Sequence, residues 1–396
     1  MFIAQFLASV GFSTIFPFLP NYVEQLGSAT GLSIVFLISA VFSSQAVAMM
    51  IASPIWGAIA DRYGRKPMVE RALFGGAIIV LLMGLARNAE ELVLLRTIQG
   101  LVTGVVSAAS SMVVAATPKD RIGYAMGAMQ TASLLGVSIG PVVGGLLEYQ
   151  FGARLSFIIT GILLFLGGFI VLFGVKENFT PLPKKERPKG NLIVQWGMLL
   201  SAPNVLLTYS LRFLAWLARN MMVPFMPLFI ITLMPDPSLA SVYTGFTIAI
   251  ASVAGAVSGF TLGRIGDKIG HAKVLIVSAF LTAVLHIPIA FAGSLWSFIL
   301  FNTFVGYTVG GVLPMISSLL AKTTTPEQAG QVYGLDNSVT AAARAIAPMV
   351  AGSFIGMAFI WGPPNYRIVY LMAGVLFAVT GALALRLLRK PRAVTT

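Results

Sequence analysis

The sequence predicts an all-α membrane protein whose twelve transmembrane helices form two pseudo-symmetric six-helix bundles. Hydrophobic residues make up 57% of its 396 residues, and charged residues only 10%. A soluble domain has about a quarter of its residues charged, so a water-soluble globular fold is excluded. A charged turn at residues 57–66 also returns, in weaker form, at residues 263–270, about half the chain later. Such duplication is typical of a membrane protein built as two copies of one bundle.

Apolar stretches long enough to cross a bilayer, which takes about 20 residues, recur along the whole chain. The connections between them are short and contain Gly, Pro or charged residues. No basic segment precedes the first stretch, which is longer than the apolar part of a signal peptide, so no cleavable signal is expected. The predicted spans cover residues 2–26, 32–59, 68–86, 91–116, 123–147, 154–175, 204–233, 241–264, 273–293, 295–321, 330–359 and 367–388.

Basic residues follow the even-numbered spans and predict the orientation of the chain. The opposite connections hold Arg87, Arg154 and Arg367, accompanied by several acidic residues. The side of a membrane protein that is rich in Lys and Arg is cytoplasmic, so both termini are predicted to be cytoplasmic. The net charge of +13 therefore records topology, and a nucleic-acid partner is not expected.

One long polar connection predicts the boundary between the two halves. It is rich in proline and basic residues, which is typical of a flexible, solvated tether. We therefore predict an N-terminal six-helix bundle at residues 1–177, a cytoplasmic linker at 178–200 and a C-terminal six-helix bundle at 201–396.

The turn at residues 57–66 combines glycine with charge. Gly57 and Gly64 permit close backbone approach and a tight turn between two spans. Asp61 can interact with positive helix N-termini or with Arg65, which would form a cytoplasmic latch that biases the conformational equilibrium. The alternative is a solvated turn that only maintains topology.

The second copy of this turn is weaker. Asp267 and Gly270 stand 206 positions after Asp61 and Gly64, but Ala272 replaces the lysine of the first copy. We therefore expect a weaker latch on that side. The same spacing relates three residues of the fourth span to three of the tenth: Arg96, Gly100 and Gly104 to Asn302, Gly306 and Gly310.

Glycines recur every four residues in the fifth span, at Gly136, Gly140 and Gly144. Small residues at this spacing form a ridge that lets two helices approach closely. Pro141 removes one backbone hydrogen bond and can kink the helix. These residues are candidates for gating, and helix packing alone is the alternative.

Three motifs together resemble the Major Facilitator Superfamily over nearly all of the chain. They are the duplicated turn, the segment 95–100 with Gly104, and the segment 136–145. The second is similar to the buried-arginine motif of that superfamily, and the third to the antiporter motif of its drug exporters. Residues 17–20 with Tyr22 also resemble bacterial drug:proton antiporters of the tetracycline-efflux and multidrug-resistance type. The resemblance implies twelve helices around a central cavity, alternating access, and export energised by proton entry.

Charged residues inside the spans mark the candidate functional site, because each costs at least about 2.5–3.5 kcal/mol at mid-bilayer. The predicted spans contain Arg96, Arg212, Arg219, Asp336 and Arg344. Asp336 is the only deep carboxylate, and burial favours its protonated form. Asp336 and Arg96 are therefore the candidates for proton coupling. Alternatively, Asp336 pairs with Arg212 or Arg344 as a static tie between helices.

The other candidates would bind substrate. Arg219 and Arg344 are possible anion contacts, and Gln99 lies on the same helix face as the buried arginine of its span. Trp216 and Tyr307 would supply broad aromatic walls. Four arginines against one aspartate leave the predicted site net positive. A pump for cationic drugs needs an acidic site, so the charges favour neutral, zwitterionic or anionic substrates.

These observations predict a secondary active transporter that exports amphipathic drug-like compounds in exchange for protons. The alternative is an organic-anion or metabolite exchanger of the same fold, and a receptor without flux is a third possibility. An enzyme is not expected, because the sequence lacks cysteine, a P-loop, a metal-ligand cluster and a GxSxG turn. The expected partners are a small-molecule substrate, protons and the bilayer. We expect a monomer in the prokaryotic plasma (inner) membrane that needs no cofactor beyond the proton gradient.

Overall fold

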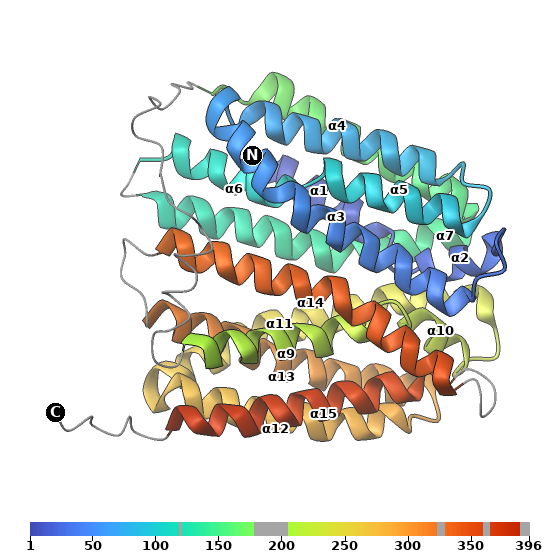
Figure 1. Ribbon diagram of the computed structural model, residues 1–396, viewed down its shortest axis with the longest axis vertical. Coiled ribbons are helices and arrows are strands. Elements are labelled where there is room, and N and C mark those ends of the chain that lie inside the picture. Colours follow the sequence, from blue (N-terminus) through green and yellow to red (C-terminus); the bar gives the residue numbers. More distant parts are fainter. Residues whose placement is uncertain (119–120, 178–204, 323–328, 359–364, 389–396) are drawn as a thin grey trace. The chain divides into compact units, whose positions relative to one another are not determined.

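The computed structural model describes residues 1–118, 121–177, 205–322, 329–358 and 365–388, and all regular structure in these ranges is helical (Figure 1). The predicted linker at 178–200 lies outside the described residues. The chain divides into two compact units. The first unit comprises Met1–Pro188, Val223–Ala249 and Pro348–Gly356, and the second comprises Lys189–Met222, Ile250–Ala347 and Met357–Thr396.

The first unit is built on the helices of the N-terminal half. The long helix α7 packs against both α1 and α4, and α3 packs against α5. Apolar sequence and few interruptions explain the length of these helices. In chain order they are α1 (Phe2–Thr14), α2 (Leu19–Leu26), α3 (Ile34–Tyr63), α4 (Lys66–Met83), α5 (Ala89–Val102), α6 (Val105–Ala116) and α7 (Ile122–Gly174).

The first predicted span is bent rather than straight. Its two helices, α1 and α2, meet at 43°. Pro17 lies in the break and Pro20 occupies the first turn of α2, and proline has no N–H with which to continue a helical ladder. The seventh predicted span is also divided, because α9 (Val205–Met222) ends before α10 (Met226–Ile231), which again has a proline in its first turn.

The prediction of one continuous helix for the fourth span is wrong. Thr103 and Gly104 separate α5 from α6, and Gly104 has a φ of +133°, which glycine adopts far more readily than other residues. The Thr103 hydroxyl donates to the carbonyl of Gln99 at 2.7 Å. The indole N–H of Trp56 donates to the carbonyl of Leu101 at 2.6 Å. The carbonyl of Gln99 also keeps its helical bond from the N–H of Thr103 at 2.8 Å. The indole of Trp56 supplies a side-chain donor for a carbonyl in the last turn of α5.

Helix α7 comprises two helical segments that meet at a kink, and they correspond to the fifth and sixth predicted spans. Gly152 interrupts it with a φ of +75°, inside the short connection predicted between those spans. Pro141 lies within the helix and does not end it. The positive φ at Gly152 is a backbone conformation that residues with a Cβ rarely adopt, so this glycine permits the change of direction.

The glycine ridge of α7 packs directly on α1. A Cβ atom added at Gly136, Gly140 or Gly144 would collide with atoms of α1, and the Ser13 hydroxyl donates across this contact to the carbonyl of Gly136 at 3.1 Å. The close approach predicted for this ridge is therefore observed. No atom of the described residues on another helix lies within 4 Å of a Cβ added at Gly57, so the close approach predicted there is wrong.

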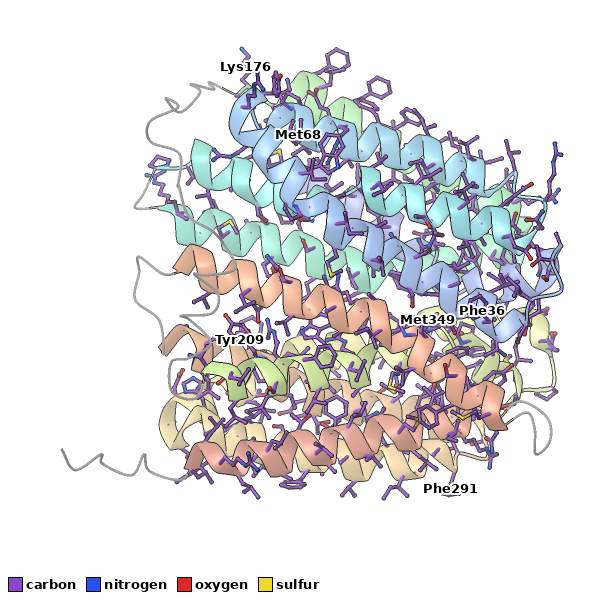
Figure 2. All side chains as sticks on the ribbon, viewed as in Figure 1. Phe36, Met68, Lys176, Tyr209, Phe291 and Met349 are labelled. Carbon is purple, nitrogen blue, oxygen red and sulfur yellow. The ribbon has the colours of Figure 1, made fainter. Side chains whose placement is uncertain are left out.

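The second unit is built on helices of the C-terminal half. Helix α12 packs against α13 and α15, and α15 packs against α9. Large apolar side chains such as Phe260 and Trp296 are exposed, as expected for helices that face lipid. Phe291, which is labelled in Figure 2, is another. Besides α9, the helices are most of α11 (Ala240–Ile269), α12 (His271–Ala290), α13 (Leu295–Lys322), most of α14 (Ala329–Ala358), α15 (Arg367–Ala384) and the 3-10 helix η6 (Leu385–Leu388).

The protein is a multi-pass membrane protein. Seven helices of the described residues are long and apolar enough to cross a membrane, or eight if the bent pair α1 and α2 counts as one span. The broken segments, such as α5 and α6, are shorter than a full span. The count of twelve spans therefore stays a prediction.

The internal duplication is visible in the backbone and in the packing. Gly64 and Gly270, which are 206 positions apart, both have left-handed φ angles, of +99° and +103°. Gly100 lies against the backbone of Gln45, and Gly306, 206 positions later, lies against the backbone of Ala251. Because Gln45 and Ala251 are also 206 positions apart, the same helix contact occurs once in each unit.

A carboxylate organises the connection between the first two spans. Glu90, in the first turn of α5, accepts hydrogen bonds from the Ser28 and Thr30 hydroxyl groups at 2.7 Å each. It also accepts from the backbone N–H groups of Ala29 and Thr30, each at 3.1 Å. These donors, led by the Ser28 and Thr30 hydroxyls, lower the pKa of Glu90 to about 2, because they stabilise its charged form.

This pKa predicts how stability depends on pH. Glu90 has a lower pKa in the folded than in the unfolded protein, so its contribution is present above about pH 4.5 and is lost as the pH falls towards 2. We expect Glu90→Gln to lower the melting temperature in detergent at pH 7 and to lower it much less at pH 3. Glu91→Gln, which removes the same charge but leaves these hydrogen bonds intact, is the control. An equal loss for Glu90→Gln at both pH values would contradict this prediction.

Candidate transport site and gating turn

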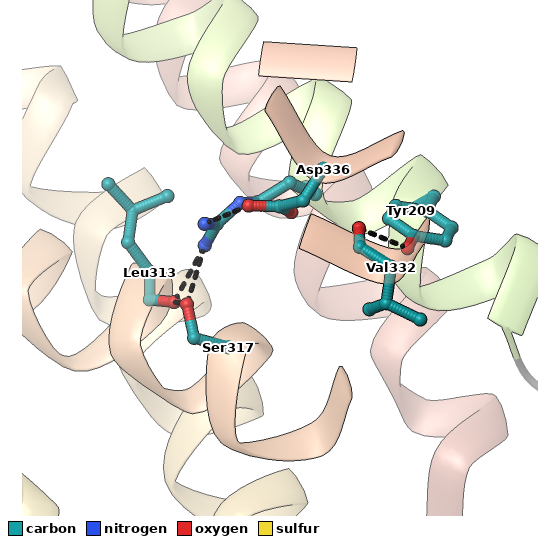
Figure 3. A network of polar contacts seen from close by, with 6 residues as sticks. Tyr209, Leu313, Ser317, Val332 and Asp336 are labelled. Carbon is teal, nitrogen blue, oxygen red and sulfur yellow. Dashed lines mark hydrogen bonds and ion pairs between the residues drawn. The ribbon is translucent and has the colours of Figure 1, made fainter. Parts of the chain in front are cut away.

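An ion pair ties α9 to α14 in the second unit. Arg212 Nη2 donates to Asp336 Oδ2 at 2.7 Å, and Arg212 Nη1 donates to the carbonyl of Leu313 at 3.1 Å and to Ser317 Oγ at 3.0 Å (Figure 3). One guanidinium group therefore connects three helices. Both charged side chains are 12% exposed. Of the two partners considered for Asp336, the structure selects Arg212.

The carboxylate of Asp336 is incompletely satisfied. Its Oδ1 atom and the Nε atom of Arg212 are buried and have no hydrogen-bond partner among the described residues. A second contact joins the same two helices near this pair, because the Tyr209 hydroxyl donates to the carbonyl of Val332 at 3.0 Å (Figure 3). Only the Arg212–Asp336 contact depends on charge, so a proton on Asp336 would weaken one contact and leave the other.

Two arginines lie against one indole ring two turns farther along. The guanidinium carbon of Arg219 is 5.6 Å from the ring centroid of Trp216, and that of Arg344 is 4.8 Å away. Arg219 follows Arg212 by seven residues, so both project from one face of α9. The side chains of Arg219 and Arg344 are exposed although they lie within long helices. The buried indole N–H has no partner among the described residues.

The charge of this cluster is not balanced. None of the ion pairs among the described residues includes Arg219 or Arg344. Each cation–π contact contributes about 0.5–2 kcal/mol, which orients a guanidinium group without neutralising it. The arrangement offers two fixed positive charges, an aromatic face and a free indole donor. Chemically, it fits a ligand with a negatively charged or strongly polar group beside an apolar body.

The buried arginine of α5 is held by neutral groups. Arg96 is 1% exposed, and its Nη1 donates to Gln99 Oε1 at 2.8 Å. Its Nε donates to the carbonyl of Val41 at 3.4 Å, and its guanidinium lies 5.7 Å from the ring centroid of Phe42. Arg96 Nη2 and Gln99 Nε2 have no partner among the described residues. Two buried donors therefore remain for an acceptor.

Tyr307 has a different environment from Trp216. Its hydroxyl lies 2.8 Å from the hydroxyl of Thr261, which joins α13 to α11 within the second unit. Sequence reasoning placed Tyr307 and Trp216 in one aromatic wall, and no contact among the described residues joins them. Among those residues, the clusters of acidic and histidine side chains do not form a metal site.

The duplicated turn differs between its two copies. In the first copy, Gly64 reverses the chain between α3 and α4, and the side chain of Asp61 lies outside the described residues. In the second copy, Asp267 Oδ1 lies 3.3 Å from His271 Nε2, one helical turn away. That contact is local, and Asp267 is 74% exposed, so it is weak.

The sequence pattern did not identify Glu177, an acidic residue that contacts the first copy of the duplicated turn. Glu177, three residues after the end of α7, accepts hydrogen bonds from the backbone N–H groups of Arg65 and Lys66. It is 112 positions from Arg65, so no local pattern connects the two. The one available signal was that α4 begins at Arg65 and Lys66 without Ser, Thr, Asp or Asn as a cap.

Known proteins share this architecture and sequence. The sequence model of the Major Facilitator Superfamily matches residues 1–257 and 208–396. The chain is 34% identical to the multidrug resistance protein MdtG of Salmonella typhimurium over 349 residues, covering 88% of this chain and 86% of that protein. MdtG of Salmonella heidelberg is 33% identical over 373 residues, covering 94% and 90%.

Solved structures agree in fold. The nucleoside transporter NupG has a TM-score of 0.79 at 14% identity, with 98% of each chain covered. The human organic anion transporter MFSD10 has a TM-score of 0.66 at 19% identity, with 97% of each chain covered. The chain therefore belongs to the Major Facilitator Superfamily and is a membrane transporter.

Proposed function

We propose that this secondary transporter exports amphipathic drug-like compounds in exchange for protons by alternating access. The MdtG relatives, which are named for multidrug resistance, support export of drugs. We further propose two homologous halves at residues 1–177 and 201–396, both termini in the cytoplasm, a monomeric state and a location in the prokaryotic plasma membrane. The proton gradient supplies the energy, and no cofactor is required.

The proposed charge of the substrate is inferred from the cluster of Arg219, Trp216 and Arg344. Both guanidinium groups lie against one indole ring, and no described carboxylate pairs with either of them. A cationic drug would be repelled by this arrangement, whereas an anionic or zwitterionic group would gain charge-assisted hydrogen bonds. The aromatic face suits apolar bodies of varied shape. Gln99 and Tyr307 are proposed as further polar contacts for the substrate.

Asp336 is the proposed proton carrier. When it is charged, it holds Arg212 and so ties α14 to α9 and α13. Protonation removes the negative charge and weakens that tie, while Arg212 keeps its hydrogen bonds to α13. The proton thus changes how firmly α14 is attached within the second unit. Arg96, buried with a free donor, is proposed to stabilise charge during the same cycle.

The duplicated turn and the glycine ridge are the proposed gating elements. Their residues act through backbone geometry and helix contact rather than through substrate. Gly64 and Gly270 reverse the backbone, and the ridge brings α7 against α1. The proposed gating set is Gly57, Asp61, Gly64, Arg65, Asp267, Gly270, Gly136, Gly140, Pro141 and Gly144.

Transport assays separate this function from an organic-anion or metabolite exchanger. A growth-inhibition panel of cationic, zwitterionic and anionic antibiotics in a pump-deficient bacterial host identifies an exported compound. Inside-out vesicles are then given that compound with and without an imposed proton gradient. Uptake that requires the gradient supports proton-coupled export. If the uptake rate does not depend on the proton gradient but rises when an anion is present on the opposite side of the membrane, the protein is an exchanger instead.

A further inference from the structure

The entry to the central linker is attached to the gating turn by hydrogen bonds in both directions. Glu177 Oε1 accepts from the N–H of Arg65 at 2.9 Å, and Oε2 accepts from the N–H of Lys66 at 2.8 Å. In return, Lys66 Nζ donates to the carbonyl of Leu172 at 2.8 Å, in the last turn of α7. We call this pair of contacts, made by Glu177 and Lys66, the clasp.

Each half of the clasp satisfies groups that a helix end leaves unpaired. The first N–H groups of α4 have no intrahelical partner, and the residue that caps α4, Arg65, provides no side-chain hydrogen bond. A carboxylate at a helix N-terminus is also favoured by the helix dipole, as is an ammonium group at a C-terminus. Glu177 and Lys66 occupy these two favourable positions, at the start of α4 and at the end of α7.

The clasp holds the turn next to Gly64, whose backbone has a left-handed φ angle. Gly64 has a φ of +99°, and its N–H already bonds to the carbonyl of Ala60 at 3.0 Å. Glu177 holds the next two N–H groups along the chain. Three consecutive N–H groups are therefore fixed, so the orientation of the turn depends on a residue 112 positions away.

The C-terminal half has no equivalent of the clasp. Lys66 corresponds to Ala272 at the 206-residue spacing, and no acidic residue follows Asp336 in the sequence. The second turn retains a left-handed glycine, Gly270, and a local contact between Asp267 and His271. The residue pair that anchors the turn in the N-terminal half thus has no counterpart in the sequence of the C-terminal half.

We propose that Glu177 is a positioning residue for transport: it holds the gating turn in its working conformation and makes the turn, the start of α4 and the end of α7 move together. The residue acts through the backbone of Arg65 and Lys66 and does not touch substrate. Its loss should therefore slow the conformational cycle and leave substrate affinity unchanged. This proposal depends on transport by the chain and not on the choice of proton or anion coupling.

A labelling experiment tests the proposal without a substrate. The chain has no cysteine, and Met68, in the first turns of α4, is 7% exposed and lies at the same end of α4 as Lys176 (Figure 2). We expect Met68→Cys to react slowly with fluorescein maleimide in membranes. Adding Glu177→Ala should speed this reaction about tenfold, the effect of losing a charged helix cap. Glu177→Gln, which keeps one acceptor oxygen, should give an intermediate rate.

A transport measurement on the same variants completes the test, with the compound identified in the growth panel. Glu177→Ala should lower the maximal rate about tenfold with an unchanged KM. Glu70→Gln is the matched control, because Glu70 lies 3.6 Å from Lys66 Nζ but does not bind the turn's backbone. Unchanged labelling and transport in Glu177→Ala would overturn the proposal. So would a slower rate with unchanged labelling, or an equal effect of Glu70→Gln. If Glu177→Ala fails to fold, the intermediate behaviour of Glu177→Gln decides the matter.

Discussion

Asp336→Asn is expected to reduce uptake driven by a proton gradient in inside-out vesicles by about 100-fold or more, while substrate binding persists. An amide cannot carry the proton, so the tie between Asp336 and Arg212 no longer responds to pH. The substitution also leaves Arg212 without its counter-charge. Removing one partner of a buried ion pair costs up to about 3–5 kcal/mol, and less here because the pair is 12% exposed.

A double variant separates the proton carrier from a static tie. Asp336→Asn combined with Arg212→Gln removes both charges, so the cost of an unpaired buried charge disappears. If Asp336 only ties helices together, this double variant should recover stability and gradient-driven transport. If Asp336 carries the proton, the double variant should recover its melting temperature but remain uncoupled. Recovery of coupled transport would therefore refute the proton-carrier role.

Arg219→Ala and Arg344→Ala are expected to reduce transport of anionic compounds by about 10–100-fold in kcat/KM. Each removes one of the two charges that face Trp216. Neutral compounds should be affected much less, and cationic compounds should be transported better, because the repulsion falls. Rates measured in vesicles for compounds of each charge give this comparison directly.

A lysine substitution at Arg344 separates the effect of charge from the effect of the planar guanidinium group. Arg344→Lys keeps the charge but loses the planar group that stacks on Trp216, so partial activity towards anions is expected. Arg386→Ala, which removes an exposed charge at η6, is the control. An equal loss for anionic and neutral compounds in Arg219→Ala and Arg344→Ala would show that the arginines support the fold and do not select charge.

Several features of the fold are readable from the chain because they depend on local sequence. Spans follow from apolar length, and the duplicated turn follows from glycine and charge at a fixed spacing. Both turns do contain a left-handed glycine, at Gly64 and Gly270. The interruptions were less predictable. The break at Thr103 and Gly104 in the fourth span is accompanied by a hydrogen bond from Trp56 on another helix, which hydropathy does not reveal.

The charged residues of the candidate site can be named from the sequence, but their pairings cannot. A charge inside an apolar span is conspicuous, so Arg219, Asp336 and Arg344 stood out at once. Which arginine pairs with Asp336 depends on helix rotation and axial register, and both follow from packing along entire helices. Tyr307, grouped with Trp216 on residue type alone, makes its contact with Thr261 instead.

The sequence by itself determined the membrane class, the internal repeat and the excess of positive charge within the apolar spans, because these are properties of composition and spacing. The tertiary structure alone decided that Arg212 neutralises Asp336, that Arg344 joins Arg219 at Trp216, and that Glu177 caps a helix 112 positions earlier in the chain. These contacts join residues far apart in the sequence. Their geometry is set by how whole helices pack, and no short segment of the chain encodes it.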